Sequence, residues 1–234
     1  MREPERLLLL GGLQQLRLDE QMLAERLERY AELVEKFNPR YRLVADSERL
    51  VTHHLLDSVA AVPVLRGLGP AARLMDVGSG AGLPGIPLAL CLPEWQVTLV
   101  ERSARRARFL LLVRKELQLA NCTVIASSLE QLGQMAADEP QDVIVFRAVA
   151  ETNSMLADLR VLGRHRAVLH QGTVVVAFKG RRDRLEQELV MVEQPYEIHE
   201  LSVPFLFRER HLLLLHGPWE GTRRGANDGL AADS

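Results

Sequence analysis

The chain has 234 residues, 47% hydrophobic and 26% charged, and its 29 Lys and Arg side chains nearly balance 31 Asp and Glu side chains, for a formal net charge of −2. This composition is typical of a single globular protein and excludes a uniformly basic surface that binds nucleic acid everywhere. Two cysteines are too few for a disulfide scaffold, so we expect Cys91 and Cys122 to be buried thiols.

The N-terminal part is expected to be helical. An apolar run at residues 7–10 is interrupted by two glycines, and no segment approaches the roughly 20 apolar residues of a membrane span. Apolar side chains recur at steps of three and four over residues 22–37, which predicts an amphipathic helix capped by Asp19. A second helix is predicted over residues 50–62, with Asp46 and Ser47 ahead of it and its end near Pro63 and Gly67. We therefore expect two helices before the first strand.

Short apolar runs then alternate with helical patterns, which predicts a parallel sheet with crossover helices. The predicted strands cover residues 74–77, 97–100, 122–126, 143–146 and 173–178, and the predicted helices cover residues 86–92, 104–117, 152–162 and 184–192. Two last runs, 198–203 and 211–216, have no helix between them and predict an antiparallel pair that closes the sheet.

The chain is expected to divide into three parts. Residues 1–68 would form a helical extension packed on the core, residues 69–217 the ligand-binding domain, and residues 218–234 a disordered tail, because the sequence from Gly217 is rich in Gly, Asp, Arg and Ala.

The most informative segment is DVGSGAGLPGIPLAL, which starts at Asp76, where the first predicted strand ends. Its glycines let the backbone turn sharply and approach a ligand, and the helix that follows offers free N–H groups. A dinucleotide loop would have glycine where Leu83 stands, and a phosphate-binding P-loop would need a lysine that the segment lacks. The remaining common ligand is S-adenosylmethionine, which carries no phosphate and would lie beside Gly78, Gly80 and Gly82.

Polar side chains at the ends of the next strands support a ligand site. Glu101 ends the second strand, 23 residues after Gly78, where a ribose diol would donate two hydrogen bonds to it. Glu130 follows the third strand, where the adenine edge would lie, and Arg147 ends the fourth. Because ligands of open α/β sheets bind at the carboxyl ends of strands, these residues and Asp76 are candidate cofactor contacts.

Nine short motifs then occur in an order that a known family shares. They are FNPRYRL, HHLLDS, DVGSGAGLPGIPLAL, RARFL, KELQL, SSLEQL, FRAVAE, AFKG and ERHLLLL. On these motifs the chain resembles, over about residues 22–216, the GidB (RsmG) family of bacterial 16S rRNA guanine-N7 methyltransferases. It departs from the family's usual Asn-Leu-Thr at residues 42–44, which read Arg-Leu-Val.

The resemblance implies a Rossmann-like class I methyltransferase, an α/β fold with a seven-stranded, mostly parallel sheet and antiparallel C-terminal strands. It implies S-adenosyl-L-methionine as cofactor, S-adenosyl-L-homocysteine as product, and as substrate a guanine in the 530-loop region of 16S rRNA, free or in the small ribosomal subunit. The family's cofactor-contact positions correspond here to Gly78, Leu83, Leu129, Glu130 and Arg147.

Guanine N7 is an exposed lone pair that can attack a sulfonium methyl without losing a proton. The reaction therefore requires positioning rather than a general base, and we name no catalytic residue. Basic residues after the fifth strand lie on the same rim as the glycine loop, and we expect this rim to contact RNA phosphate. The candidate RNA contacts are Arg147, Lys179, Arg181, Arg182 and Arg184.

Two other functions remain open from the sequence. One is a methyltransferase of the same fold that acts on a small molecule or a protein. The other is a non-catalytic S-adenosylmethionine-binding module, for which the departure at residues 42–44 is the best reason. We expect a cytoplasmic monomer with no metal and no membrane partner.

Overall fold

The computed structural model describes residues 1–18, 21–46, 49–134, 140–147, 152, 156–158, 168–190 and 192–219. The predicted cap Asp19, the residue Ser47 and most of the predicted helix 152–162 fall outside these ranges. Of that helix, Thr152 and residues 156–158 are described and are helical.

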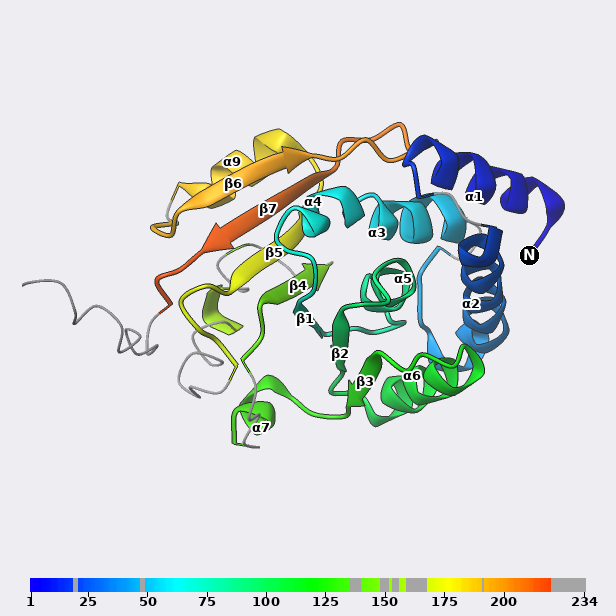
Figure 1. Cartoon of the computed structure of the whole chain (residues 1–234), viewed down its shortest axis with the longest axis horizontal. Helices are drawn as coiled ribbons and strands as arrows, with labels where there is room; N and C mark the ends of the chain where they lie inside the picture. The colour runs from blue at the N-terminus through cyan, green and yellow to red at the C-terminus, as the bar shows by residue number, and fades with distance from the viewer. Residues whose placement is uncertain are drawn as a thin grey trace, which may run out of the picture.

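The described residues form a seven-stranded sheet with the strand order β3-β2-β1-β4-β5-β7-β6 (Figure 1). The strands are β1 (Arg73–Val77), β2 (Gln96–Val100), β3 (Cys122–Ile125), β4 (Val143–Arg147), β5 (Val174–Lys179), β6 (Tyr196–Glu200) and β7 (His211–His216). Neighbouring strands from β3 to β5 are parallel, whereas β7 pairs antiparallel with both β5 and β6. The predicted α/β fold, with an antiparallel pair closing a parallel sheet, is confirmed.

The sheet is covered by helices on both faces. The helices are α1 (Glu3–Gln15), α2 (Gln21–Tyr41), the π-helix η2 (Val51–Leu56), α3 (Asp57–Val59), α4 (Val62–Arg66), α5 (Gly85–Cys91), α6 (Ala104–Glu116), α7 (Leu129–Gln134) and α9 (Arg182–Leu189). Successive side chains of a strand point to opposite faces, and β4 shows the result. Val143 and Val145 join the apolar cluster that includes α1 to α6, while Ile144 and Phe146 join a second cluster with α7 and α9.

The N-terminal part contains more helix than the sequence predicted. The expectation of two helices before the first strand was wrong, because α1 runs through Gly11 and Gly12. Gly12 has a packing reason: a methyl group at this position would lie 2.5 Å from a Leu56 side-chain carbon of η2. The predicted end near Pro63 and Gly67 agrees with the structure at Gly67, which caps α4, whereas Pro63 occupies the first turn of α4, where its missing N–H costs no hydrogen bond.

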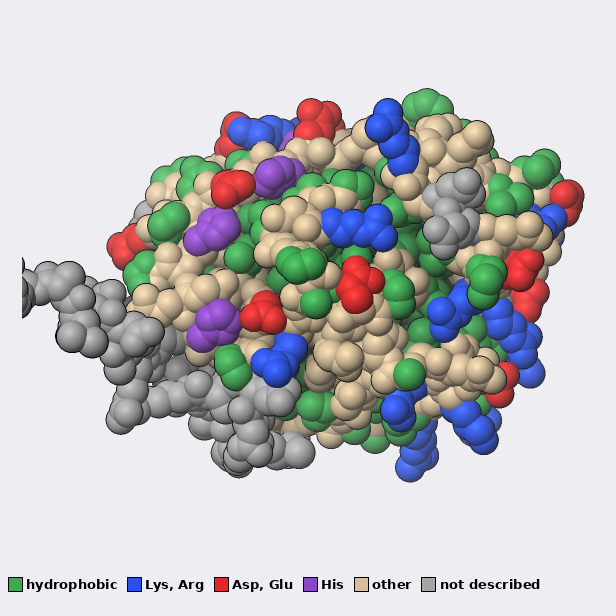
Figure 2. All heavy atoms as spheres, in the orientation of Figure 1, with side chains coloured by type: hydrophobic (Ala, Val, Ile, Leu, Met, Phe, Trp, Pro, Cys, Tyr) green, Lys and Arg blue, Asp and Glu red, His purple; other side chains and the backbone are tan. Residues whose placement is uncertain are grey.

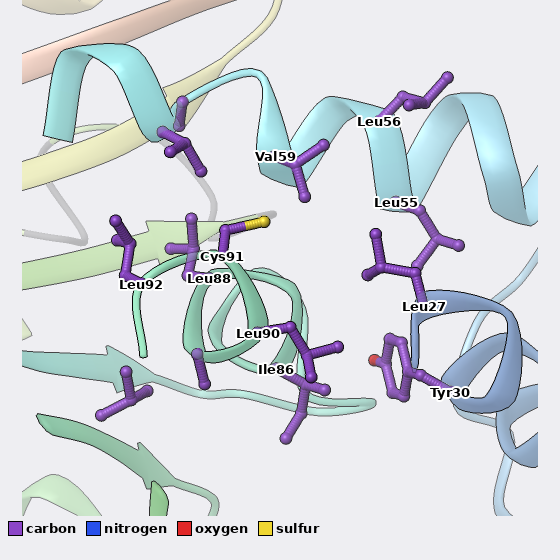
Figure 3. Close-up of a cluster of buried hydrophobic side chains, with 14 of the residues drawn as sticks. Leu27, Tyr30, Leu55, Leu56, Val59, Ile86, Leu88, Leu90, Cys91 and Leu92 are labelled. Carbon is purple, nitrogen blue, oxygen red and sulfur yellow. The ribbon is translucent and has the colours of Figure 1, made fainter. Parts of the chain in front are cut away.

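The extension and the sheet share one core. Helix α5 is buried along its whole length and packs between the sheet and the helices α2, η2 and α3 (Figure 3). Tyr30 of α2 is fully buried, and its hydroxyl donates a 2.8 Å hydrogen bond to the carbonyl of Ala81 in the glycine loop. Residues 1–68 therefore help to fix the loop that follows β1.

Three smaller expectations can be checked. Cys91 and Cys122 are free, buried thiols as predicted, and burial raises the pKa of each to about 12. The expected disordered tail was wrong at Trp219, which is buried and donates a 3.0 Å hydrogen bond to the carbonyl of Thr173. No helix in the described ranges is long and apolar enough to cross a membrane.

Candidate functional site

The loop after β1 folds back over the end of β2. The amides of Gly78 and Ser79 both donate to the carbonyl of Val100, at 2.9 and 3.0 Å. Gly78, Gly80 and Gly82 have φ values of +73°, +57° and +94°, which residues other than glycine rarely adopt. The sharp turn expected of these glycines is therefore present.

The glycines of the loop serve different purposes. A methyl group on Gly82 would lie 2.5 Å from Cγ1 of Ile86 and 3.0 Å from Cδ2 of Leu110, so this glycine is required by packing against the core. A methyl group on Gly78 would have no heavy atom of the described chain within 4 Å. Gly78 faces a cavity instead.

Asp76 is buried beneath the loop. Its Oδ2 accepts a 3.0 Å hydrogen bond from the amide of Gly85, at the start of α5, and burial raises the pKa of its carboxyl to about 7. Leu83 is half-buried and packs against the core. Neither residue lines the cavity that Gly78 faces, so a cofactor contact by Asp76 or Leu83 stays a prediction.

Glu101 directly follows the carboxyl end of β2, and 3% of its surface is exposed. Its Oε2 accepts from the amide of Gly80 and its Oε1 from the amide of Ser103, both at 2.8 Å. Each carboxylate oxygen has two lone pairs, so each can accept one more hydrogen bond. The two backbone amides hold the carboxylate in place, and its remaining lone pairs suit a pair of hydroxyl groups.

These features surround a cavity of about 380 Å³, within the range of small-molecule sites. It is lined by Val77, Gly78, Val100, Glu101, Arg102, Arg106, Ser127, Ser128, Leu129 and Asp158. Leu129 lines this cavity, and its cofactor contact stays a prediction, whereas the side chain of Glu130 lies outside what the structure describes. A carboxylate with spare lone pairs, an open glycine and the apolar Val77 and Leu129 fit S-adenosylmethionine, which has a ribose diol and an adenine ring.

Arg102, Arg106 and Asp158 were not among the residues predicted to line the site. Several basic residues occur over residues 102–115, and the sequence does not show which of them turn toward the glycine loop. Asp158 belongs to a helix far along the chain, so only the folded arrangement brings it beside β1 and β2.

Arg147 ends β4 and points into η2. Its guanidinium donates to the carbonyl of His53 at 2.7 Å and to the hydroxyl of Ser58 at 2.8 Å, and it lies 2.9 Å from Oδ2 of Asp57. These hydrogen bonds from Arg147 to helical carbonyls compete with the backbone hydrogen bonds of the helix, which accounts for the local π-helix. Arg147 does not line the cavity, so its predicted contacts with cofactor and RNA stay predictions.

His54, Asp57 and Ser58 do not form a nucleophilic triad. The hydroxyl of Ser58 donates to the backbone carbonyl of His54 at 2.6 Å, and Asp57 pairs with Arg147 and, at 2.8 Å, with Arg210. Burial and the charge of Arg147 lower the pKa of His54 to about 4. These residues anchor η2 to the sheet.

The basic rim predicted after β5 borders a groove of about 980 Å³. Lys179 is mostly buried and lies 2.7 Å from Glu188. Arg181 pairs with Asp183, and Arg182 lies 2.7 Å from Glu186. The two exposed ion pairs, of Arg181 and Arg182, each contribute about 0–1 kcal/mol to stability, so an RNA phosphate can replace their carboxylate partners.

Arg184 lines the same groove and has no carboxylate partner among the described residues. Figure 2 shows that acidic and basic side chains are interspersed over the face in view, with Lys and Arg gathered over the side of α2 and α6. This agrees with the mixed surface expected from a net charge of −2.

The described residues contain no group of three or more His, Cys, Asp or Glu side chains that could hold a metal ion.

Comparison with known proteins decides the family. The sequence profile of the GidB family, described as rRNA small subunit methyltransferase G, matches residues 23–213. The chain belongs to the GidB family. The resemblance inferred from the motifs is thereby confirmed, and helix α1 precedes the residues that the family profile matches.

Individual GidB relatives match along most of their length. The chain is 38% identical over 198 residues to ribosomal RNA small subunit methyltransferase G of Neisseria meningitidis serogroup C, covering 82% of this chain and 87% of that protein. It is 38% identical over 207 residues to the protein of the same name from Methylobacillus flagellatus, covering 87% and 94%.

Solved structures agree on the fold of this GidB protein. The magnesium protoporphyrin IX methyltransferase of Synechocystis, with S-adenosylmethionine bound, superposes with a TM-score of 0.53 at 18% identity, over 80% of this chain and 97% of that one. At that identity the likeness establishes the Rossmann-like methyltransferase fold alone.

Proposed function

We propose that the chain transfers a methyl group from S-adenosylmethionine to N7 of a guanine in the 530-loop region of 16S rRNA. Membership of the GidB family supports the reaction class and the ribosomal substrate. The observation that carries the cofactor is the cavity between the glycine loop and Glu101. The proposal places the chain in the cytoplasm with the rRNA on which it acts.

Different residues of the cavity would contact different parts of the cofactor. The Glu101 carboxylate, held by two backbone amides, would accept the hydrogen bonds of the ribose diol. Ser127, Ser128 and Leu129, at the end of β3, would surround the adenine. Gly78 leaves room for the amino-acid part, since nothing of the described chain lies within 4 Å of where its side chain would be.

The chemistry asks little of the chain beyond positioning. S-adenosylmethionine supplies an electrophilic methyl group bound to a positively charged sulfur. The guanine N7 lone pair attacks without prior deprotonation, so the chain has to hold the two reactants in line and exclude water. The RNA would be held by phosphate contacts on the basic rim, of which Arg184 is the member without a carboxylate partner among the described residues.

Methyl transfer tests the proposal directly. The purified chain is incubated with methyl-labelled S-adenosylmethionine and either naked 16S rRNA or small subunits from a strain lacking this modification, and the methylated nucleotide is mapped by mass spectrometry. We expect 7-methylguanosine at one guanine of the 530-loop region. Cofactor binding without transfer to RNA would refute the enzymatic claim, and label in small molecules or proteins would favour a different substrate class.

The basic rim has its own test. Replacement of Arg181, Arg182 and Arg184 by Ala should weaken binding to small subunits and reduce the salt dependence of that binding. The reason is that each lost phosphate contact lowers the number of counterions released on binding by about one. Unchanged affinity and an unchanged salt slope would remove this rim from the RNA interface.

A further inference from the structure

The groove beside the basic rim has a second wall that the motifs did not point to. One wall comes from the end of β5 and from α9, and the other from residues 207–210 in the connection between β6 and β7. On that second wall, the side chain of Phe207 is 99% exposed. Its ring is therefore accessible, at the edge of a charged groove, to whatever the groove binds.

The connection that carries Phe207 is firmly held. Leu201 and Val203 are each 7% exposed, and the amide of Leu201 donates a 2.8 Å hydrogen bond to the carbonyl of Arg210. The ring of Phe205 lies against α1, since a methyl group on Gly11 would be 3.4 Å from its Cζ.

The far end of the connection is also tied down. Arg210 forms its 2.8 Å ion pair with the buried Asp57, and Glu209 accepts a 2.9 Å hydrogen bond from the amide of Arg182 at the start of α9. Phe205 has a φ of +61°, a strained value for an aromatic residue. The connection is thus a fixed platform that lays the ring of Phe205 against α1 and turns Phe207 fully outward.

The charges around Phe207 identify the kind of partner. The groove is lined by five basic side chains and two acidic ones; the basic ones are Lys179, Arg181, Arg184, Arg208 and Arg210, and the acidic ones are Glu188 and Glu209. Arg184 and Arg208 have no carboxylate partner among the described residues, so their guanidinium groups are available to an anion. An aromatic ring next to cations is the arrangement that holds single-stranded nucleic acid, because bases stack on rings while cations contact phosphates.

The groove also lies on the side of the sheet where the reaction would occur. It opens at the carboxyl end of β5, which is separated from β1 by β4 alone, a lateral distance of about 10 Å at the usual strand spacing. A strand of RNA in the groove would therefore lie beside the glycine loop and its cavity.

We propose that this groove binds an unpaired stretch of the RNA substrate, with a base stacked on Phe207 and its phosphates held by Arg184 and Arg208. This deepens the proposed function and rests on it for the identity of the RNA. Phe207 is a positioning residue, which holds a nucleotide near the target guanine.

Direct binding tests the stacking. Affinity for a fluorescein-labelled, short oligouridylate is measured by anisotropy for the unchanged chain and for Phe207→Ala, Phe207→Trp and Phe207→Leu. Stacking on one base predicts a loss of about 5- to 150-fold for Phe207→Ala, recovery in Phe207→Trp, and no recovery in Phe207→Leu. Tyr196→Ala removes an exposed aromatic ring on β6 away from the groove and should bind as the unchanged chain does.

The charge component is measured on the same probe. Arg184→Ala combined with Arg208→Ala should lower the slope of log affinity against log salt by about 1.4, two contacts at about 0.7 each for a single strand. In methyl-transfer assays, Phe207→Ala should raise KM for the RNA substrate and leave S-adenosylmethionine affinity unchanged, because Phe207 does not line the cofactor cavity.

The failures of the two proposals can be told apart. If the unchanged chain binds the oligonucleotide through Phe207 but methylates no rRNA, the proposed function fails and the groove assignment stands. If the chain methylates rRNA while Phe207→Ala matches Tyr196→Ala in both assays, the groove assignment is overturned. Wild-type affinity in Phe207→Leu would indicate an apolar protein contact and would also overturn it, as would no binding of the oligonucleotide by the unchanged chain.

Discussion

Two glycines of one loop should separate stability from cofactor binding. In Gly82→Ala, the new methyl group would lie 2.5 Å from Ile86 and 3.0 Å from Leu110, at a φ of +94°. Overpacking costs about 1–3 kcal/mol and left-handed backbone strain about 1–2 kcal/mol, so the free energy of unfolding should fall by about 2–5 kcal/mol. For a chain of this size that lowers Tm by about 4–20 °C.

Gly78→Ala is the matched control in the same loop. Its φ of +73° brings the same backbone strain, but the methyl group meets no described atom within 4 Å, so the free energy of unfolding should fall by only about 1–2 kcal/mol. The methyl group would enter the cavity instead, where a steric conflict of about 1–3 kcal/mol weakens S-adenosylmethionine binding about 5- to 150-fold.

Thermal unfolding without ligand and titration calorimetry with S-adenosylmethionine measure the two effects separately. Equal Tm values for the two variants would refute the packing difference between Gly78 and Gly82. Wild-type cofactor affinity in Gly78→Ala would refute the placement of the cofactor beside Gly78.

Three further predictions concern stability. Burial raises the pKa of Asp76 from 3.8 to about 7. The free energy of unfolding is therefore highest below pH 4 and falls by roughly 4 kcal/mol as pH rises toward 7, because the unfolded chain releases this proton first. In urea titrations across this pH range, Asp76→Asn should flatten the fall, and an unchanged slope would contradict the shift. Asp57→Ala leaves the Arg147 and Arg210 guanidinium groups without their shared carboxylate and should cost about 3–5 kcal/mol in denaturant unfolding, whereas a loss below 1 kcal/mol would show that the network contributes little. Gly12→Ala, which meets Leu56 at 2.5 Å, should lower stability by about 1–3 kcal/mol, while Gly11→Ala should be neutral or stabilising by up to about 1 kcal/mol; the same Tm for both would exclude tight packing of α1 on η2.

The sequence determined the sheet and the position of the site within it. Alternating apolar runs and helices specify parallel strands with crossovers, because parallel strands need a long connection. The carboxyl ends of those strands meet at one edge, which placed Gly78, Glu101 and Leu129 together in advance. The helix α1 was missed because its two glycines are unfavourable locally, and the need for Gly12 appears only in its packing against η2.

Only the tertiary structure decided the role of individual side chains. Asp76 and Glu101 are both carboxylates at strand ends, yet Asp76 is buried against the amide of Gly85 whereas Glu101 lines the cavity. Arg147 follows a strand like the other candidates but turns into the π-helix. Phe207 has no distinguishing pattern around it, because its exposure depends on Phe205 and Arg210 being held by elements far away in the chain. Periodicity determines which face of a strand or helix is apolar, whereas side-chain partners depend on contacts between distant segments, and sequence spacing carries no record of those contacts.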